Sequence, residues 1–276
     1  MKNIGVMYQK GDGVDVNLEK AMNYYKLASN NGDSDCTNCI GLMYKEGQGI
    51  KQNKEKAIKY FKMAIEKGNT DAMVNLGKML LETKEPDQIN EAIKIFKNAA
   101  ELNNTKAMFN LSIIFNQGIG KSVNKEKSIE YLHKAIDLGE VLAMRALAIR
   151  YKEGDGVPID LEKSFNLLKT AADTGSTEDM LLLGLDYQNG SGTEKNPKEA
   201  IKYFKKGTEL GNINCMTAYA EALYLGLGTE INETKAMKYY LEAASKGNAI
   251  AMGRVGSIML DNDKNSERGF QFLRMA

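Results

Sequence analysis

Apolar and polar residues alternate along the chain with the period of amphipathic α-helices. One example is the segment 72–82, in which small or apolar residues lie three and four positions apart. These residues are Ala72, Met73, Leu76, Gly77 and Leu80. The spacing places them on one face of a helix, so the pattern predicts a helix whose buried side follows that face. We name this type of helix helix A.

A second amphipathic pattern follows helix A after a turn, and we name it helix B. In the segment 54–68, the candidates for its buried face are Ala57, Tyr60, Phe61 and Ala64. Most copies of helix A end in a G-x-G sequence, and most copies of helix B end in a single glycine. A glycine accepts the positive φ of a helix C-terminus or a chain reversal. The sequence therefore predicts pairs of helices joined by glycine turns.

The helix pair recurs at a nearly constant interval. The small residue in the middle of helix A is found at Gly5, Gly41, Gly77, Ser112, Ala148, Gly184, Ala220 and Gly256. Neighbouring members of this series lie 36 residues apart, except for 35 between Gly77 and Ser112. We therefore predict a single array of eight repeats, the first and last of them incomplete. Their boundaries are 1–33, 34–69, 70–104, 105–140, 141–176, 177–212, 213–248 and 249–276.

Small and bulky residues share fixed positions in these repeats. We expect the small residues, such as Gly77 on helix A and Ala57 on helix B, to let neighbouring helices approach closely. We expect the tyrosines and Phe115 to fill the space between successive helix pairs as core residues. The residues concerned are Tyr8, Tyr24, Tyr44, Tyr60, Phe115, Tyr131, Tyr151, Tyr187, Tyr203 and Tyr239. The abundance of asparagine is attributed to base composition and carries no prediction.

These motifs carry a family resemblance. The pattern A-x-x-N-L-G-x-x-Y-x-x-G-x-G-V followed by K-A-x-x-Y-F-x-x-A-A-x-x-G-N resembles the Sel1-like repeat, a relative of the tetratricopeptide repeat. It covers essentially the whole chain, with a departure at 83–87, where TKEPD replaces G-x-G. The resemblance implies an all-α fold, a right-handed superhelical α-solenoid of stacked antiparallel helix pairs. It also implies a scaffold or adaptor that binds other proteins, as in signalling.

Composition narrows the classes of partner. Lysine and arginine number 37 against 36 acidic residues, a formal net charge of +1 without a long run of either sign. We therefore expect no nucleic acid as partner. No window approaches the roughly 20 apolar residues that span a bilayer, so we expect no membrane insertion. Three unevenly placed cysteines indicate a reducing compartment. We expect a cytoplasmic protein, although a targeting segment can lie outside this chain.

Two features suggest chemistry, and the repeat pattern explains both. Cys36 and Cys39 form a C-x-x-C sequence, yet Cys36 occupies the helix A position that is Ala72 in the next repeat. A small core residue is the simpler interpretation, and no strand precedes it to form a redox unit. His133, the only histidine, aligns with lysines and is expected on the surface. We predict no catalytic residue, no metal ligand and no cofactor.

The resemblance to tetratricopeptide repeats places a binding groove on the concave surface formed by helix A. The partner is expected to be an unidentified protein or peptide. The predicted groove residues are Val74, Asn75, Lys78, Phe109, Asn110, Ile113, Arg145, Ile149, Leu181, Leu182 and Leu185. The same register adds Asn214, Thr217, Ala218, Glu221, Tyr224 and Leu225. Six of these residues would form an apolar patch in the middle of the groove: Phe109, Ile113, Ile149, Leu181, Leu182 and Leu185. Asn75 and Asn110 either bind a peptide backbone or tether helix A to its neighbour.

Two alternatives to the scaffold remain open. The first is a structural spacer that self-associates end to end through uncapped terminal repeats. The second is an enzyme that binds or hydrolyses β-lactams, since some cysteine-rich bacterial members of the family are associated with that activity. Those members carry a regular pair of disulfide-forming cysteines in each repeat, and this sequence lacks such pairs. It also offers no serine or lysine outside the repeat pattern beside an organised base.

Overall fold

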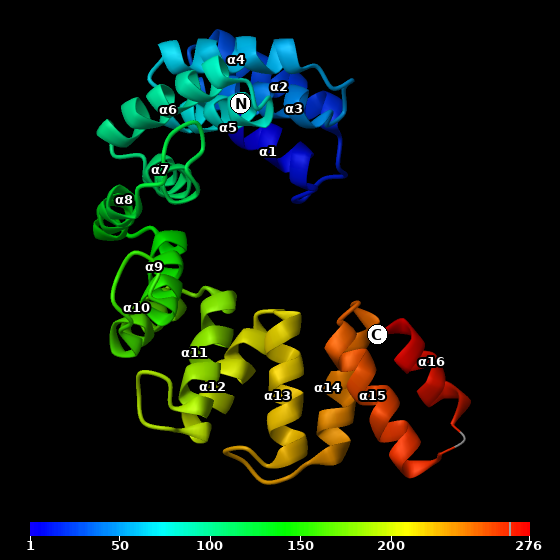
Figure 1. Ribbon diagram of the computed structural model, residues 1–276. Helices are drawn as coiled ribbons and strands as arrows, with labels where there is room; N and C mark the ends of the chain where they lie inside the picture. Colours follow the sequence, from blue (N-terminus) through cyan, green and yellow to red (C-terminus); the bar gives the residue numbers. More distant parts are fainter. Residues whose placement is uncertain (265) are drawn as a thin grey trace. The chain divides into compact units, whose positions relative to one another are not determined.

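The computed structural model describes residues 1–264 and 266–276, and in these ranges the chain forms sixteen α-helices and no strand (Figure 1). Helices A and B alternate along the chain. The A helices are α1 (Lys2–Lys10), α3 (Ser34–Glu46), α5 (Thr70–Glu82), α7 (Thr105–Gln117), α9 (Val141–Glu153), α11 (Thr177–Asn189), α13 (Ile213–Leu225) and α15 (Ala249–Asn262). The B helices are α2 (Leu18–Asn30), α4 (Lys54–Glu66), α6 (Pro86–Glu101), α8 (Lys125–Asp137), α10 (Leu161–Asp173), α12 (Pro197–Glu209), α14 (Glu233–Ser245) and α16 (Glu267–Met275). The predicted all-α repeat solenoid is confirmed.

The helices form two compact units, residues 1–140 and residues 141–276. In the first unit each A helix packs against the B helix of its own repeat, and α2, α4 and α6 each pack against the next A helix. The second unit repeats this arrangement from α9 to α16. Each unit therefore has its own succession of stacked helix pairs.

Asparagine and aspartate side chains begin most of these helices. Asn53 at the start of α4 accepts a hydrogen bond from the backbone N–H of Lys56 at 2.8 Å, and Asn69 does the same for Ala72 at 2.7 Å. Equivalent caps lie at Asn17, Asp33, Asn104, Asn124, Asp160, Asn196, Asn212, Asn232 and Asn248. Each cap satisfies a backbone N–H that has no partner inside the helix, and is worth about 1 kcal/mol. The asparagines of the repeat thus fix where its helices start.

The core of a repeat is a ring of helix B placed over a glycine of helix A. A Cβ atom at Gly41 would lie 2.6 Å from the ring of Phe61, which is fully buried. Gly184 and Phe204 repeat this contact in the second unit. At Gly41 and Gly184 glycine is required because the ring occupies the space of a side chain.

Two of the tyrosines predicted as core residues, Tyr44 and Tyr60, lie at the edge of the core. Tyr44 and Tyr60 are half-buried and stack on each other within one repeat, with ring centroids 5.5 Å apart. Lys56 covers Tyr44 with its ammonium 5.3 Å from the ring centroid. The residue after Tyr60, Phe61, is the one that fills the core. Tyr44 and Tyr60 thus pack against the core as half-buried residues, while Phe61 enters it, because adjacent helical residues differ by about 100° in direction.

The second glycine of the G-x-G turn brings one repeat close to the preceding one. Gly192 has a φ of +72°, and a Cβ atom there would overlap the backbone carbonyl of Leu161 at the start of α10. Gly228, with a φ of +76°, is related in the same way to Pro197 at the start of α12. These turns therefore fix the distance between a loop and the preceding B helix.

Candidate functional site

A pocket of about 500 Å³ lies on the A helices of the second unit. It crosses α11, α13 and α15, with α13 in the middle, and we name it the α13 pocket. Its lining residues are Leu181, Leu185, Asn214, Thr217, Ala218, Glu221, Asn248, Ile250 and Arg254. The pocket is an open trough on the helix A surface of these three repeats.

The pocket exists because a small residue lies between larger ones. Ala218 on α13 shares its repeat position with Leu182 on α11 and Arg254 on α15. Its methyl group leaves room that a longer side chain would fill. Leu185 and Ile250, which are 36 % and 69 % exposed, rise on either side of it. The result is a hollow with apolar walls and a partly buried floor.

One end of the pocket holds an ordered set of polar side chains. The hydroxyl of Tyr240, a fully buried residue, donates a hydrogen bond to one carboxylate oxygen of Glu221. Arg254 donates from Nη2 to the other oxygen at 2.5 Å. Burial, and next the hydrogen bond to Glu221, raise the pKa of Tyr240, so its hydroxyl stays protonated and keeps donating. The buried Tyr240 therefore fixes Glu221, and Glu221 in turn orients Arg254.

Two asparagines form the rim nearer the helix N-termini. Asn248 donates from Nδ2 to Oδ1 of Asn214 at 3.0 Å, and its own Oδ1 accepts from the backbone N–H of Ala251 at 2.8 Å. Each of the two side-chain carbonyls therefore already accepts one hydrogen bond. Within the described ranges, no group accepts a hydrogen bond from Nδ2 of Asn214. The rim thus offers donors to a ligand.

In the first unit, several predicted groove residues serve the fold. Val74 is buried at 2 % exposure, because its helix position faces the neighbouring helices, and burial removes it from any accessible groove. Asn75 donates to Oδ1 of Asn38 on the preceding A helix at 2.9 Å, which is the tethering role. Asn110 donates to the carbonyl of Lys106 in its own helix at 2.6 Å. Lys78 is exposed, and Phe109 and Ile113 are half-buried.

In the second unit, Arg145 is committed to an internal ion pair. Its Nε lies 2.6 Å from Oδ1 of Asp179, its Nη2 lies 2.8 Å from Oδ2, and the same Nη2 donates to Ser176 at 2.8 Å. Asp179 is fully buried. The hydrogen bond to Asp179 raises the pKa of Arg145. A residue predicted to bind a partner therefore links α9 to α11.

The predicted leucines and isoleucine divide between surface and core. Leu181 and Leu185 line the α13 pocket, whereas Leu182 packs against the core that contains Phe165 and Leu168. Ile149 is exposed on α9. The predicted continuous patch from Phe109 to Leu185 stays a prediction.

Three pocket residues were missed by the sequence reasoning: Asn248, Ile250 and Arg254. Their signal is the repeat itself, because Ile250 lies 36 residues after Asn214 and Arg254 lies 36 after Ala218. The groove register had not been extended into the incomplete last repeat.

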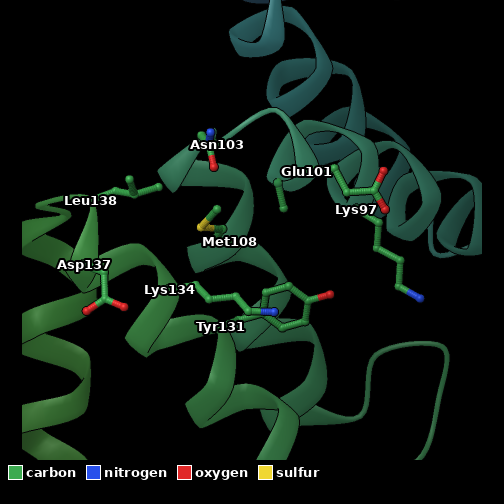
Figure 2. A pocket seen from close by; sticks show the side chains of 9 residues that line it. Lys97, Glu101, Asn103, Met108, Tyr131, Lys134, Asp137 and Leu138 are labelled. Atoms are coloured by element: carbon green, nitrogen blue, oxygen red, sulfur yellow. The ribbon is translucent and has the colours of Figure 1, made fainter.

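A second pocket, of about 580 Å³, lies in the first unit beside α6, α7 and α8 (Figure 2). Met108 and Tyr131 form part of its surface, and charged side chains of both signs surround them. Lys134 pairs with Glu130 at 2.6 Å and lies over the Tyr131 ring at 5.4 Å from its centroid. Four charged side chains line this pocket, against two in the α13 pocket, so it offers less apolar surface to a partner side chain and gives a weaker basis for a binding site.

The cysteines and the histidine that the sequence suggests for chemistry lie either in the core or on the surface. Cys36 and Cys215 are buried, and burial raises the pKa of each thiol to about 12, which keeps both protonated and unreactive. His133 is exposed, as expected. Across the described ranges, no group of three or more His, Cys, Asp and Glu side chains is arranged to hold a metal ion. Over the same ranges, no helix is long and apolar enough to cross a membrane.

Comparison with known proteins gives one consistent result. The family model for the Sel1 repeat matches residues 1–33, 40–69, 70–104, 105–140, 141–176, 177–212 and 213–248. A protective antigen of uropathogenic Escherichia coli that displays an SLR fold is 26 % identical, with a TM-score of 0.69 over 99 % of this chain. The chain spans 60 % of that protein's length. A Sel1 repeat protein from Oxalobacter formigenes is 22 % identical, with a TM-score of 0.74 over 93 % of this chain and 75 % of its own. No curated protein matches the sequence.

Proposed function

The chain belongs to the Sel1 repeat family, and from this premise we propose that it is a non-enzymatic scaffold or adaptor that binds a protein segment on its helix A surface. Sel1 repeat proteins generally act as protein–protein interaction scaffolds. The proposed surface in the second unit is the α13 pocket. Lys78, Phe109, Ile113 and Ile149 are candidates for further contacts.

The α13 pocket is the observation that supports this proposal. Small-molecule and side-chain pockets are typically lined by apolar side chains with a few polar groups, and Leu181, Leu185 and Ile250 with Glu221 and Arg254 form such a lining. The exposed Ile250 and Leu185 flank a small residue, so that a partner side chain of moderate size would be enclosed on both sides. The pocket also contains one cation and one anion, Arg254 and Glu221, which does not suit a polyanion such as nucleic acid.

Ile250→Asp is the variant that tests the proposal most cleanly. Ile250 is largely exposed, so aspartate there costs little folding free energy but places a charge against the apolar wall. Leu142 on α9 lies 108 residues earlier, at the same repeat position, and is 47 % exposed outside the pocket. Leu142→Asp is therefore a matched control with the same change of charge.

The measurement is quantitative affinity capture from extract of the source cells with wild type, Ile250→Asp and Leu142→Asp. We expect a set of proteins that wild type and Leu142→Asp retain and Ile250→Asp loses. Circular dichroism and urea midpoints confirm that the three chains are equally folded. Equal recovery by all three would refute the α13 pocket as the binding surface.

A further inference from the structure

The floor of the α13 pocket has no free polar group. Thr217 donates its hydroxyl to the carbonyl of Ile213 at 3.0 Å, and the neighbouring Ala218 presents a methyl group. Leu181 and Leu185 form one wall, and Ile250 forms part of the other. A branched or aromatic apolar side chain is the group that gains most from being buried there, because it leaves no polar atom unsatisfied.

The polar end of the pocket is unbalanced in favour of donors. Each carboxylate oxygen of Glu221 already accepts one strong hydrogen bond, from Tyr240 and from Arg254. The carbonyls of Asn214 and Asn248 each accept one hydrogen bond as well. The unused donors at this end are Nδ2 of Asn214, the second N–H of Asn248 and the guanidinium N–H groups that do not contact Glu221. A ligand that supplies acceptors pairs with these donors.

Arg254 has exposed N–H groups left to donate to a second carboxylate. Its side chain is 53 % exposed, and its contact with Glu221 uses Nη2. Glu221 is fixed by the buried Tyr240, so the guanidinium is held in one direction and less side-chain freedom is lost on binding. A planar guanidinium pairs well with carboxylates on two of its edges. A lysine or arginine of a partner would instead meet the like charge of Arg254, and the carboxylate of Glu221 is already paired with Arg254 and Tyr240.

We infer that the α13 pocket selects a protein segment in which a bulky apolar side chain lies within three residues of an aspartate or glutamate. The apolar side chain sits over Ala218, and the carboxylate accepts from Arg254 and Asn214. This inference rests on the proposed function, since it specifies the partner chemistry of the same surface.

The test uses a displayed library of random twelve-residue peptides, selected against the full chain. We expect the enriched peptides to combine leucine, isoleucine, methionine or phenylalanine with a nearby aspartate or glutamate. One enriched peptide is then synthesised with its acidic residue and with the corresponding amide. Both peptides are titrated against wild type and Arg254→Gln, with Lys246→Gln at the C-cap of α14 as the control that removes a cation outside the pocket.

The inference predicts a coupled effect in this cycle. Arg254→Gln weakens the acidic peptide about tenfold, the amide peptide is weaker on wild type by a similar factor, and the two losses are not additive. Lys246→Gln leaves both affinities unchanged. Ala218→Leu fills the pocket and lowers the affinity of both peptides more than about tenfold. Ala146→Leu, at the same repeat position of α9, does not. Ile250→Asp repeats the test of the apolar wall at an exposed position.

The outcomes separate this inference from the proposed function. Peptides that depend on Ala218 and Ile250 but carry no acidic residue, or that ignore Arg254→Gln, overturn the acidic specificity and leave the binding surface intact. No enrichment, or binding unaffected by both Ala218→Leu and Ile250→Asp, overturns the pocket as a peptide site and the proposed function with it.

Discussion

Replacing Gly192 by alanine separates the two reasons for the glycine in the G-x-G turn. Gly192 has a φ of +72°, and its missing side chain would overlap the carbonyl of Leu161 and lie 3.0 Å from Cβ of Phe165. Gly211, at the end of α12, has a φ of +85°, but no atom lies within 4 Å of its missing side chain. The two substitutions therefore share backbone strain and differ in the clash.

The expected magnitudes follow from these contacts. Alanine in a left-handed conformation costs about 1–2 kcal/mol, which is the whole effect expected for Gly211→Ala. At Gly192 the methyl group also meets backbone atoms that cannot rotate away, and overpacking of this kind adds about 1–3 kcal/mol. Gly192→Ala should thus lower the free energy of unfolding by about 2–5 kcal/mol.

Urea unfolding followed by circular dichroism measures the difference, with the slope against urea compared between variants to confirm that the same structure unfolds. If Gly192→Ala and Gly211→Ala destabilise the chain equally, the close approach of the turn to α10 contributes nothing. The account of how successive repeats are held together would then be refuted.

Two further predictions concern buried groups. Arg145→Met should lower the free energy of unfolding by about 3–5 kcal/mol, because it leaves Asp179 charged and buried. The double variant Arg145→Met, Asp179→Leu should recover most of that loss in urea unfolding. A double variant as unstable as the single one would contradict this reasoning. Because the pKa of Cys36 and of Cys215 is raised to about 12, stability should be fully present below pH 8 and should fall as pH rises from 9 toward 12, by about 1 kcal/mol per thiol between pH 9 and 10. The Cys36→Ala, Cys215→Ala variant should lose most of the fall between pH 9 and 10, whereas a fall above pH 10 should remain because burial also raises the pKa of Tyr25 and Tyr240. A thiol reagent at neutral pH should modify the half-buried Cys39 first.

The helices and turns could be predicted from the sequence because the same pattern recurs in every repeat. The helix A and helix B patterns, the glycine turns and the interval of 36 residues are local properties, and the structure confirms the helices that they predicted. The tyrosine and phenylalanine of helix B were harder to assign. Tyr60 and Phe61 both fit an amphipathic face, and only the glycine at Gly41 decides that Phe61 enters the core.

The candidate site was less accessible, because it depends on which neighbour each side chain meets. Val74 and Leu181 share one repeat position, yet the first is buried and the second lines a pocket. Arg145 has the properties of a surface cation, but it forms an ion pair with the buried Asp179 on the next A helix. The asparagines attributed to base composition are helix caps. Their position directly before each amphipathic segment is the sequence signal that identifies them.

The most direct test of the central claim is hydrogen–deuterium exchange of the full chain with and without an enriched peptide. The account predicts slower exchange in the segments 177–189, 213–225 and 249–262, which form the α13 pocket, and no change in the B helices α2, α4 and α6 of the first unit. Protection confined to B helices, or to residues 1–140, would contradict the assignment of the binding surface to the α13 pocket.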